Sequence, residues 1–285
     1  MSYSVMHNAI NILLLIAATV LLAVGVIDTL NKLNARLLFR LVGNYVTFII
    51  IGIGTMFHEL SHALFCLVFH HKIIEVNLLS YDSHSKSLGY VNHQWDKTNF
   101  YQSAGNFFIG LAPLFSGLAV YFLGNELFGS LGVAVSNTDY SAGLNTSTDS
   151  YWHMISSILY AVYQGMIQLF ALDNFKNIWF YPYVLFSITI AYAVAPSFSD
   201  LRSALPGSIA LAVLVVLANI IMYAFNMDAA FLHSLIWSYT LIALNAMGML
   251  ISCSTGLIVI LAIICIINKY MSNKNKQEGV NQSTT

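Results

Sequence analysis

His58-Glu59-Leu60-Ser61-His62 places two imidazoles four residues apart, with a carboxylate between them. Residues i and i+4 of a helix project from the same face, so both rings can converge on one metal ion. Glu59 then lies beside the ion, where it can take a proton from an activated water. Only roughly 0.004 matches to this pattern are expected by chance in a chain of this composition. The stretch predicts a metal site with His58 and His62 as ligands and Glu59 as the catalytic base.

The segment around this motif is almost wholly apolar. Between Leu41 and Phe69, the motif and Cys66 supply all of the Asp, Glu, Lys, Arg, His and Cys residues. A lone histidine in such a segment is more often a core residue satisfied by hydrogen bonds. Ionisable groups at membrane depth are costly, however, and are mostly retained for function. We therefore interpret the motif as a zinc site inside a membrane helix.

The composition is that of a membrane protein. Charged residues form only 8% of the chain and hydrophobic residues 58%, whereas soluble domains have about 25% charged residues. One globular core of this size cannot absorb so much apolar surface. We expect an integral, multi-pass membrane protein in contact with the lipid bilayer. The net charge of −1 gives no basic field, so no nucleic-acid partner is expected.

The cysteines indicate neither a disulfide framework nor a cysteine metal site. Cys66, Cys253 and Cys265 all lie in apolar segments, and their spacing shows no pairing. We interpret them as small hydrophobic residues.

Apolar stretches predict about seven membrane spans, because a bilayer core of about 30 Å needs near 20 helical residues. The stretches are 9–27, 41–69, 103–124, 153–172, 176–196, 207–226 and one within 231–268. The last is long enough to extend beyond the bilayer or to break near Gly248 or Gly256. Alternating residues in 72–79 and 88–91, around a polar turn at 82–87, predict a small β-hairpin between the second and third spans. The predicted fold class is therefore an all-α polytopic membrane protein with one small hairpin.

Two histidines do not complete a catalytic zinc site, which ordinarily has three protein ligands and an open position. The glutamates outside the motif are poorly placed, and among the other histidines His233 is the best candidate and His153 the next. Asp200 is stronger, because it follows Pro196 at the mouth of a helix, where negative charge is favoured. The alternative is that Asp200 is only an N-cap or a surface partner of Arg202.

Three motifs of this chain form one recognisable pattern. The first is Phe57-His58-Glu59-Leu60-Ser61-His62-Ala63-Leu64, followed by the hairpin segment that ends in Gly89-Tyr90-Val91. The second is Gly110-Leu111-Ala112-Pro113-Leu114-Phe115-Ser116-Gly117, and the third is Pro196-Ser197-Phe198-Ser199-Asp200. Together they resemble the site-2 protease family of intramembrane metalloproteases, over about residues 41–226.

The resemblance implies a zinc metalloendopeptidase that cleaves membrane-spanning or membrane-adjacent proteins and peptides. It implies that Zn²⁺ is held by His58, His62 and Asp200, and that Glu59 is the base. Asp200-Leu201 departs from the family's usual Asp-Gly pair, and Ser116 stands where an Asn is common. We expect Ser116 and Ser199 to help position the substrate.

The domain organisation follows from the spans and the resemblance. Residues 1–40 hold a first span and a basic loop, 41–226 the metalloprotease-like core, 227–268 a C-terminal membrane segment and 269–285 a polar tail that we expect to be disordered. Lys and Arg near the span ends favour an amino terminus outside and a carboxy terminus inside. Short connections fit a bacterial plasma membrane.

Three other functions fit parts of the pattern. A transporter or channel would have ionisable residues scattered over several spans, whereas here they concentrate in one motif and Asp200. A non-proteolytic metal-binding regulator fits the departures near Ser116 and Asp200. A protease with a glutamate as third ligand lacks a suitable glutamate.

Overall fold

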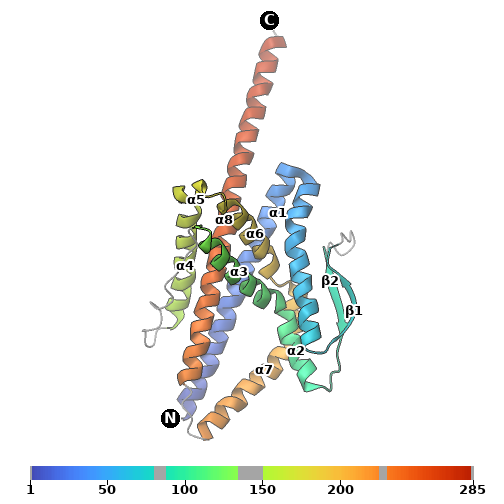
Figure 1. Cartoon of the computed structure of the whole chain (residues 1–285), viewed down its shortest axis with the longest axis vertical. Coiled ribbons are helices and arrows are strands. Elements are labelled where there is room, and N and C mark those ends of the chain that lie inside the picture. The colour runs from blue at the N-terminus through green and yellow to red at the C-terminus, as the bar shows by residue number, and fades with distance from the viewer. Residues whose placement is uncertain (1, 80–87, 134–149, 225–229, 284–285) are drawn as a thin grey trace.

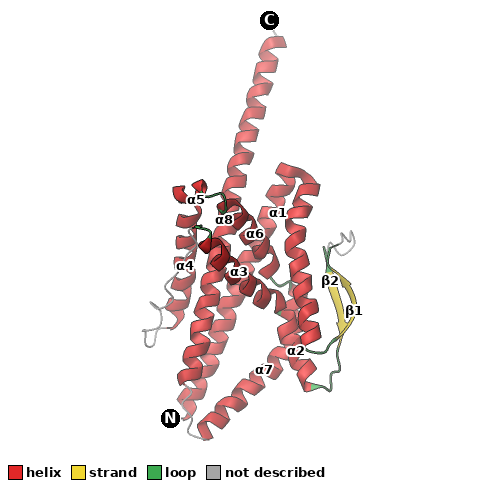
Figure 2. Ribbon diagram, viewed as in Figure 1, coloured by secondary structure: helices red, strands yellow, loops and turns green. Residues whose placement is uncertain are grey.

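The described part of the chain is mostly helical, with one small sheet (Figure 2). The computed structural model describes residues 2–79, 88–133, 150–224 and 230–283. Its elements are α1 (Ser2–Val68), β1 (Lys72–Asn77), β2 (Tyr90–Gln94), α2 (Phe100–Gly110), α3 (Ala112–Ser130), α4 (Ser150–Leu169), α5 (Leu172–Lys176), α6 (Phe180–Val194), α7 (Phe198–Ala224) and α8 (Ala230–Ser283). A helical fold with a hairpin after the second apolar stretch is therefore confirmed.

Helix α1 consists of two arms that meet at Gly43. This residue has φ 79° and ψ 177°, a conformation outside the helical region that glycine adopts readily because it lacks a Cβ. Figure 1 shows the chain rising from the N-terminus, turning over and descending as a second arm. The two arms correspond to the apolar stretches 9–27 and 41–69. The second arm carries the His-Glu-x-x-His motif.

Two helix pairs near the motif are broken at a sharp bend. The axes of α2 and α3 differ by 56°, and those of α6 and α7 by 58°. The apolar stretch 103–124 was expected to be a single span, but it breaks at Leu111. Pro113 lies in the first turn of α3, and Pro196 separates α6 from α7. Both prolines remove a backbone N–H, which favours a helix boundary.

Helix α8 runs without a break through Gly248 and Gly256. It also continues as helix to Ser283, into the polar tail that the sequence predicts to be disordered. Extending an existing helix adds one hydrogen bond per residue without a new nucleation step. In Figure 1 this end of α8 extends beyond the other helices.

The apolar core lies between the first arm of α1 and helices α3, α6 and α8. Ile27, Tyr121, Val194 and Leu250 are fully buried there. By length and composition, two described helical segments, Ala17–Val68 and Ser238–Met271, can cross a membrane, or up to four if each bent pair forms one span. This arrangement is consistent with a membrane protein, while the expected number of about seven spans stays a prediction.

The hairpin lies beside the second arm of α1 (Figure 1). Strands β1 and β2 are antiparallel, with an irregular register between Ile73 and Glu75. The second strand begins and ends slightly later than the predicted 88–91, and the turn predicted at 82–87 lies outside the described residues. A Cβ added to Gly89 would lie 2.7 Å from Cγ of Glu59. The start of β2 is therefore packed directly against the motif.

Gly207 allows α7 to approach α2 closely. A Cβ at this position would overlap the backbone nitrogen of Phe107. We expect Gly207→Ala to destabilise the fold by about 1–3 kcal/mol, because overpacking forces the helices apart. Gly25→Ala is the matched control, since a Cβ there meets nothing within 4 Å. Thermal unfolding of the detergent-solubilised variants measures both effects, and equal stabilities would contradict the packing argument.

Candidate metal centre

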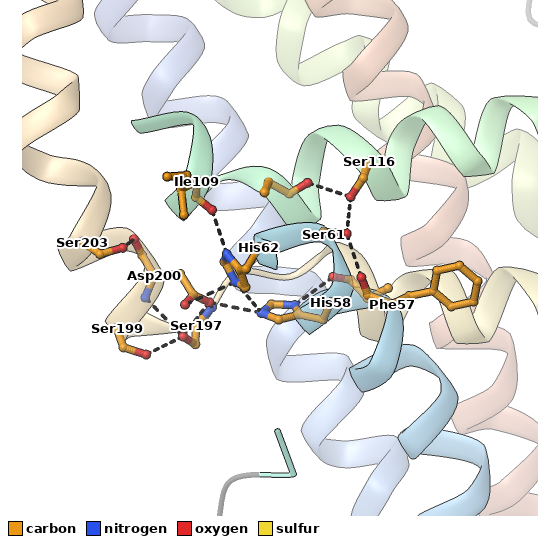
Figure 3. A network of polar contacts seen from close by, with 12 residues as sticks. Phe57, His58, Ser61, His62, Ile109, Ser116, Ser197, Ser199, Asp200 and Ser203 are labelled. Carbon is orange, nitrogen blue, oxygen red and sulfur yellow. Dashed lines mark hydrogen bonds and ion pairs between the residues drawn. The ribbon is translucent and has the colours of Figure 1, made fainter. Parts of the chain in front are cut away.

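The structure brings together the side chains of His58, His62 and Asp200 (Figure 3). The Nε2 atoms of the two histidines lie 3.2 Å apart. Oδ2 of Asp200 lies 3.2 Å from Nε2 of His58, and Oδ1 lies 3.5 Å from Nε2 of His62. Asp200 comes from the first turn of α7, 142 residues away from His58. All three residues predicted as ligands therefore meet at one point.

Two backbone carbonyls determine which nitrogen of each ring faces that point. Nδ1 of His58 lies 3.0 Å from the carbonyl oxygen of Ala193, and Nδ1 of His62 lies 2.7 Å from that of Ile109. A carbonyl only accepts hydrogen bonds, so each Nδ1 carries the hydrogen and donates it. In the neutral rings, both Nε2 atoms then present lone pairs. This is how metal-binding histidines are usually held.

The two carbonyls are available because the helices that carry them end there. The usual helical partner of the Ile109 carbonyl would be the N–H of residue 113, which is a proline and has none. The usual partner of the Ala193 carbonyl is the N–H of Ser197, which instead donates to Oδ2 of Asp200 at 2.6 Å. Each of these carbonyls therefore lacks its usual i+4 helical partner, although the N–H of Leu111 also points to the Ile109 oxygen, and a histidine lies at hydrogen-bond distance from each.

With both rings neutral, the site gathers two lone pairs and one negative charge. Two Nε2 atoms and a carboxylate repel one another unless a cation lies among them. That cation is either a metal ion or an extra proton on one ring. In a tetrahedral zinc site with bonds of about 2.0–2.1 Å, two ligand atoms are about 3.3 Å apart. The Nε2 atoms are 3.2 Å apart, and each lies 3.2 or 3.5 Å from a different oxygen of the Asp200 carboxylate. These separations are close to that value, so the residues fit a zinc ion.

Asp200 is held by its own helix terminus as well as facing the histidines. Oδ2 of Asp200 accepts hydrogen bonds from the N–H and the hydroxyl of Ser197, each at 2.6 Å. The N–H of Asp200 donates to Oγ of Ser197 at 3.2 Å. These reciprocal bonds form a capping box at the start of α7. Asp200 therefore has a local role at the helix start, as the alternative proposed, as well as facing the histidines. Among the described residues, the ion-pair partners of Asp200 are the histidines rather than Arg202.

The centre is partly shielded from solvent. The side chains of His58 and His62 are 12% and 8% exposed, and that of Asp200 is 17% exposed. Glu59 follows His58 on the same helix, is partly buried and contacts the backbone at Gly89. Of the three candidate ligands, Asp200 is therefore the most exposed.

The two serines expected to position a substrate have other contacts. Ser116 donates to Oγ of Ser61 and also lies 2.7 Å from the carbonyl oxygen of Ala112. Figure 3 shows this pair on the side of the histidines away from Asp200. Oγ of Ser199 lies 2.7 Å from Oγ of Ser197 and is exposed. Their role with substrate stays a prediction.

Sequence reasoning did not find the carbonyls of Ile109 and Ala193 or the cap residue Ser197. In the sequence, Pro113 and Pro196 were the signals for these carbonyls, because a proline often lies at a helix boundary and leaves a nearby carbonyl without its usual partner. The side chains of the alternative ligands His153 and His233 lie outside the described part of the structure.

Comparisons of the chain with protein-family models, with characterised proteins and with solved structures found no match.

Pro113→Ala tests the role of the free carbonyl. The substitution supplies an N–H at position 113, the usual i+4 partner of the Ile109 carbonyl, and this N–H competes with Nδ1 of His62 for the oxygen. We expect metal affinity to fall by about 10–100-fold, as for other outer-shell changes. Chelator-competition titration of the purified protein measures it. Pro206→Ala, at an exposed proline inside α7, should leave the affinity unchanged. An unchanged affinity in Pro113→Ala would contradict this role.

Proposed function

We propose that the protein is an intramembrane zinc metalloprotease of the site-2 protease type, as its motifs suggest. The observation that carries the proposal is the convergence of two Nε2 lone pairs and the Asp200 carboxylate. Three protein ligands with an open fourth position are typical of catalytic rather than structural zinc. Glu59 next to two of these ligands supplies the base that a hydrolase of this kind needs.

The reaction would divide among the residues as follows. Zn²⁺ held by His58, His62 and Asp200 supplies Lewis acidity toward the scissile carbonyl. Glu59 accepts a proton from the attacking water and passes it to the leaving amine. The carbonyls of Ile109 and Ala193 keep the rings in the required tautomer. Burial of these groups strengthens their electrostatic interactions.

The substrate would be a membrane-spanning or membrane-adjacent peptide in extended form. The site lies among apolar helices, so a soluble folded protein has poor access to it. Among the described residues β1 and β2 form a two-stranded sheet, and an extended peptide could add to such a sheet as a further strand. Because Gly89 packs against Glu59, a peptide held by the hairpin would lie near the base.

We further propose about seven membrane spans in a bacterial plasma membrane. The opposed arms of α1 support two spans within the one helical segment Ala17–Val68. Lys and Arg near the span ends favour a cytoplasmic carboxy terminus. Lys32 and Arg36 lie in α1 rather than in the expected basic loop. With two spans between residues 125 and 196, Asp200 would emerge on the same side as these two residues, so the site would open toward the cytoplasm.

A non-proteolytic metal-binding regulator is the second candidate. The observation that favours it is that Ser116 and Ser199, the candidates for substrate contact, are engaged with Ser61 and Ser197. Such a protein would keep its metal and cleave nothing. The next experiment separates the two functions.

Glu59→Gln removes the base while it keeps the size of the side chain. We expect bound zinc to remain and cleavage to fall by at least about 10²-fold, the lower range for loss of a general base. Accumulation of uncleaved membrane proteins, compared by mass spectrometry with cells expressing the wild type, measures cleavage. Glu126→Gln, at an exposed position of α3, is the control. Undiminished cleavage in Glu59→Gln refutes the mechanism.

Asp200→Ala and His62→Ala test the ligand set. Each removes one of three ligands, so each should lose one equivalent of zinc per chain, measured by elemental analysis of the purified protein. Asp173→Ala is the control, because its carboxylate is 93% exposed and pairs only with Lys176 among the described residues. Full retention of zinc in Asp200→Ala would assign the third ligand elsewhere.

A further inference from the structure

A second cluster of metal-binding side chains lies outside the candidate centre. Cys66, His71 and His93 each offer one ligand atom, and these atoms all lie within 4.8 Å of one another. Cys66 belongs to the last turns of α1, His71 follows that helix, and His93 lies in β2. None of the three belongs to the His58, His62 and Asp200 set.

The turn at the end of α1 places the backbone of His71 next to that of Cys66. His70 has φ 55°, a left-handed conformation that is uncommon outside glycine. The N–H of His71 then donates to the carbonyl oxygen of Cys66 at 2.8 Å. This six-residue closure is the Schellman motif with a histidine in the usual glycine position. The local backbone therefore determines the proximity of the two side chains.

The tautomer of His71 is determined by a backbone carbonyl. Nε2 of His71 lies 2.8 Å from the carbonyl oxygen of Gln102, in the first turn of α2. The nitrogen must donate, so Nδ1 of the neutral ring presents a lone pair. That Nδ1 lies 3.0 Å from Nδ1 of His93. His71 is thus held by a carbonyl as His58 and His62 are, with the two ring nitrogens exchanged.

Burial disfavours the charged form of both rings. Burial lowers the pKa of His93 to about 4 and also lowers the pKa of His71. Cys66 is completely buried and His71 is 4% exposed. Trp95 stacks on His71 with ring centroids 5.7 Å apart, which covers the cluster further. The thiol of Cys66 and the ring of His71 are therefore shielded from solvent.

We propose that Cys66, His71 and His93 form a second metal site, which binds Zn²⁺ through one thiolate and two imidazoles. Thiolate and imidazole ligands select zinc or copper over magnesium, calcium and manganese, and the Cys-His-His set with an open fourth position suits zinc. Binding forms one Zn–S and two Zn–N bonds, and the thiol proton of Cys66 passes to solvent.

The competing explanation is a hydrogen bond from Nδ1 of His93 to Nδ1 of His71. It accounts for the distance of 3.0 Å between them, but it gives no role to the thiol at the third corner. The two explanations differ in one respect that can be measured. Only the metal site requires Cys66 to become a thiolate.

The second site would fasten the hairpin to the membrane helices. It would link the end of α1 to β2 directly, and to α2 through the Gln102 carbonyl. Gly89, just before β2, packs against Glu59. An ion bound here would therefore keep the hairpin in place beside the candidate base, a structural role separate from hydrolysis.

Cobalt substitution distinguishes the two sites, because only the second contains sulfur. The full-length protein in detergent is stripped of metal and titrated with Co²⁺. The wild type should bind two equivalents and show a near-ultraviolet thiolate-to-cobalt charge-transfer band. His62→Ala should lose one equivalent and keep the band, whereas Cys66→Ser should lose one equivalent together with the band. Cys253→Ser, at another buried cysteine, should retain both.

Two outcomes would overturn the second site: a wild type without the band, or a Cys66→Ser protein that still binds two equivalents. If Cys66→Ser fails to fold, Cys66→Ala replaces it, since an apolar residue suits the buried position. In the His62→Ala background Zn²⁺ should raise the unfolding temperature. The same addition should have no effect in His62→Ala/Cys66→Ala. A rise of equal size in both proteins also refutes the site.

Discussion

The two hydrogen bonds from imidazole Nδ1 atoms to the carbonyls of Ile109 and Ala193 are the constraint on which the candidate centre depends. In a membrane, a backbone carbonyl without a partner costs free energy, because no water is present to satisfy it. The breaks after α2 and α6 each leave a carbonyl without its usual i+4 partner, and a histidine of α1 donates to it. The same bond turns the lone pair of each Nε2 inward. Each of these hydrogen bonds therefore stabilises a helix break and fixes the orientation of a candidate ligand at the same time.

Asp200, the third candidate ligand, is held by hydrogen bonds to its carboxylate rather than by a distant carbonyl. Its carboxylate is fixed by Ser197, which caps α7 and donates two hydrogen bonds to Oδ2. The amino end of a helix also favours a negative charge. A long, flexible acidic side chain would lose more conformational entropy on ordering than this short, doubly held one. Gly110 contributes by allowing α2 to approach the backbone of Asp200 closely.

The ligands could be predicted from the sequence, but their supports could not. The spacing of His58 and His62 follows from helix periodicity, and Pro196 pointed to Asp200 as the residue after a helix break. The carbonyl partners lie 47 and 135 residues from their histidines, and no local pattern encodes such pairing. The same limit hid the second cluster, in which His71 and His93 are 22 residues apart. Cys66 was interpreted as a small hydrophobic residue because its partners are distributed over a helix end and a strand.

The hairpin supplies His93 to the second cluster and also packs against the His-Glu-x-x-His motif. Two strands alone are marginally stable, and this pair has an irregular register between Ile73 and Glu75, so its position must be held from outside. At its base, His71 and His93 tie it to α1 and α2. Near its other end, Gly89 rests on Glu59. The hairpin therefore connects the side-chain cluster at its base with the backbone that packs against Glu59 near its other end.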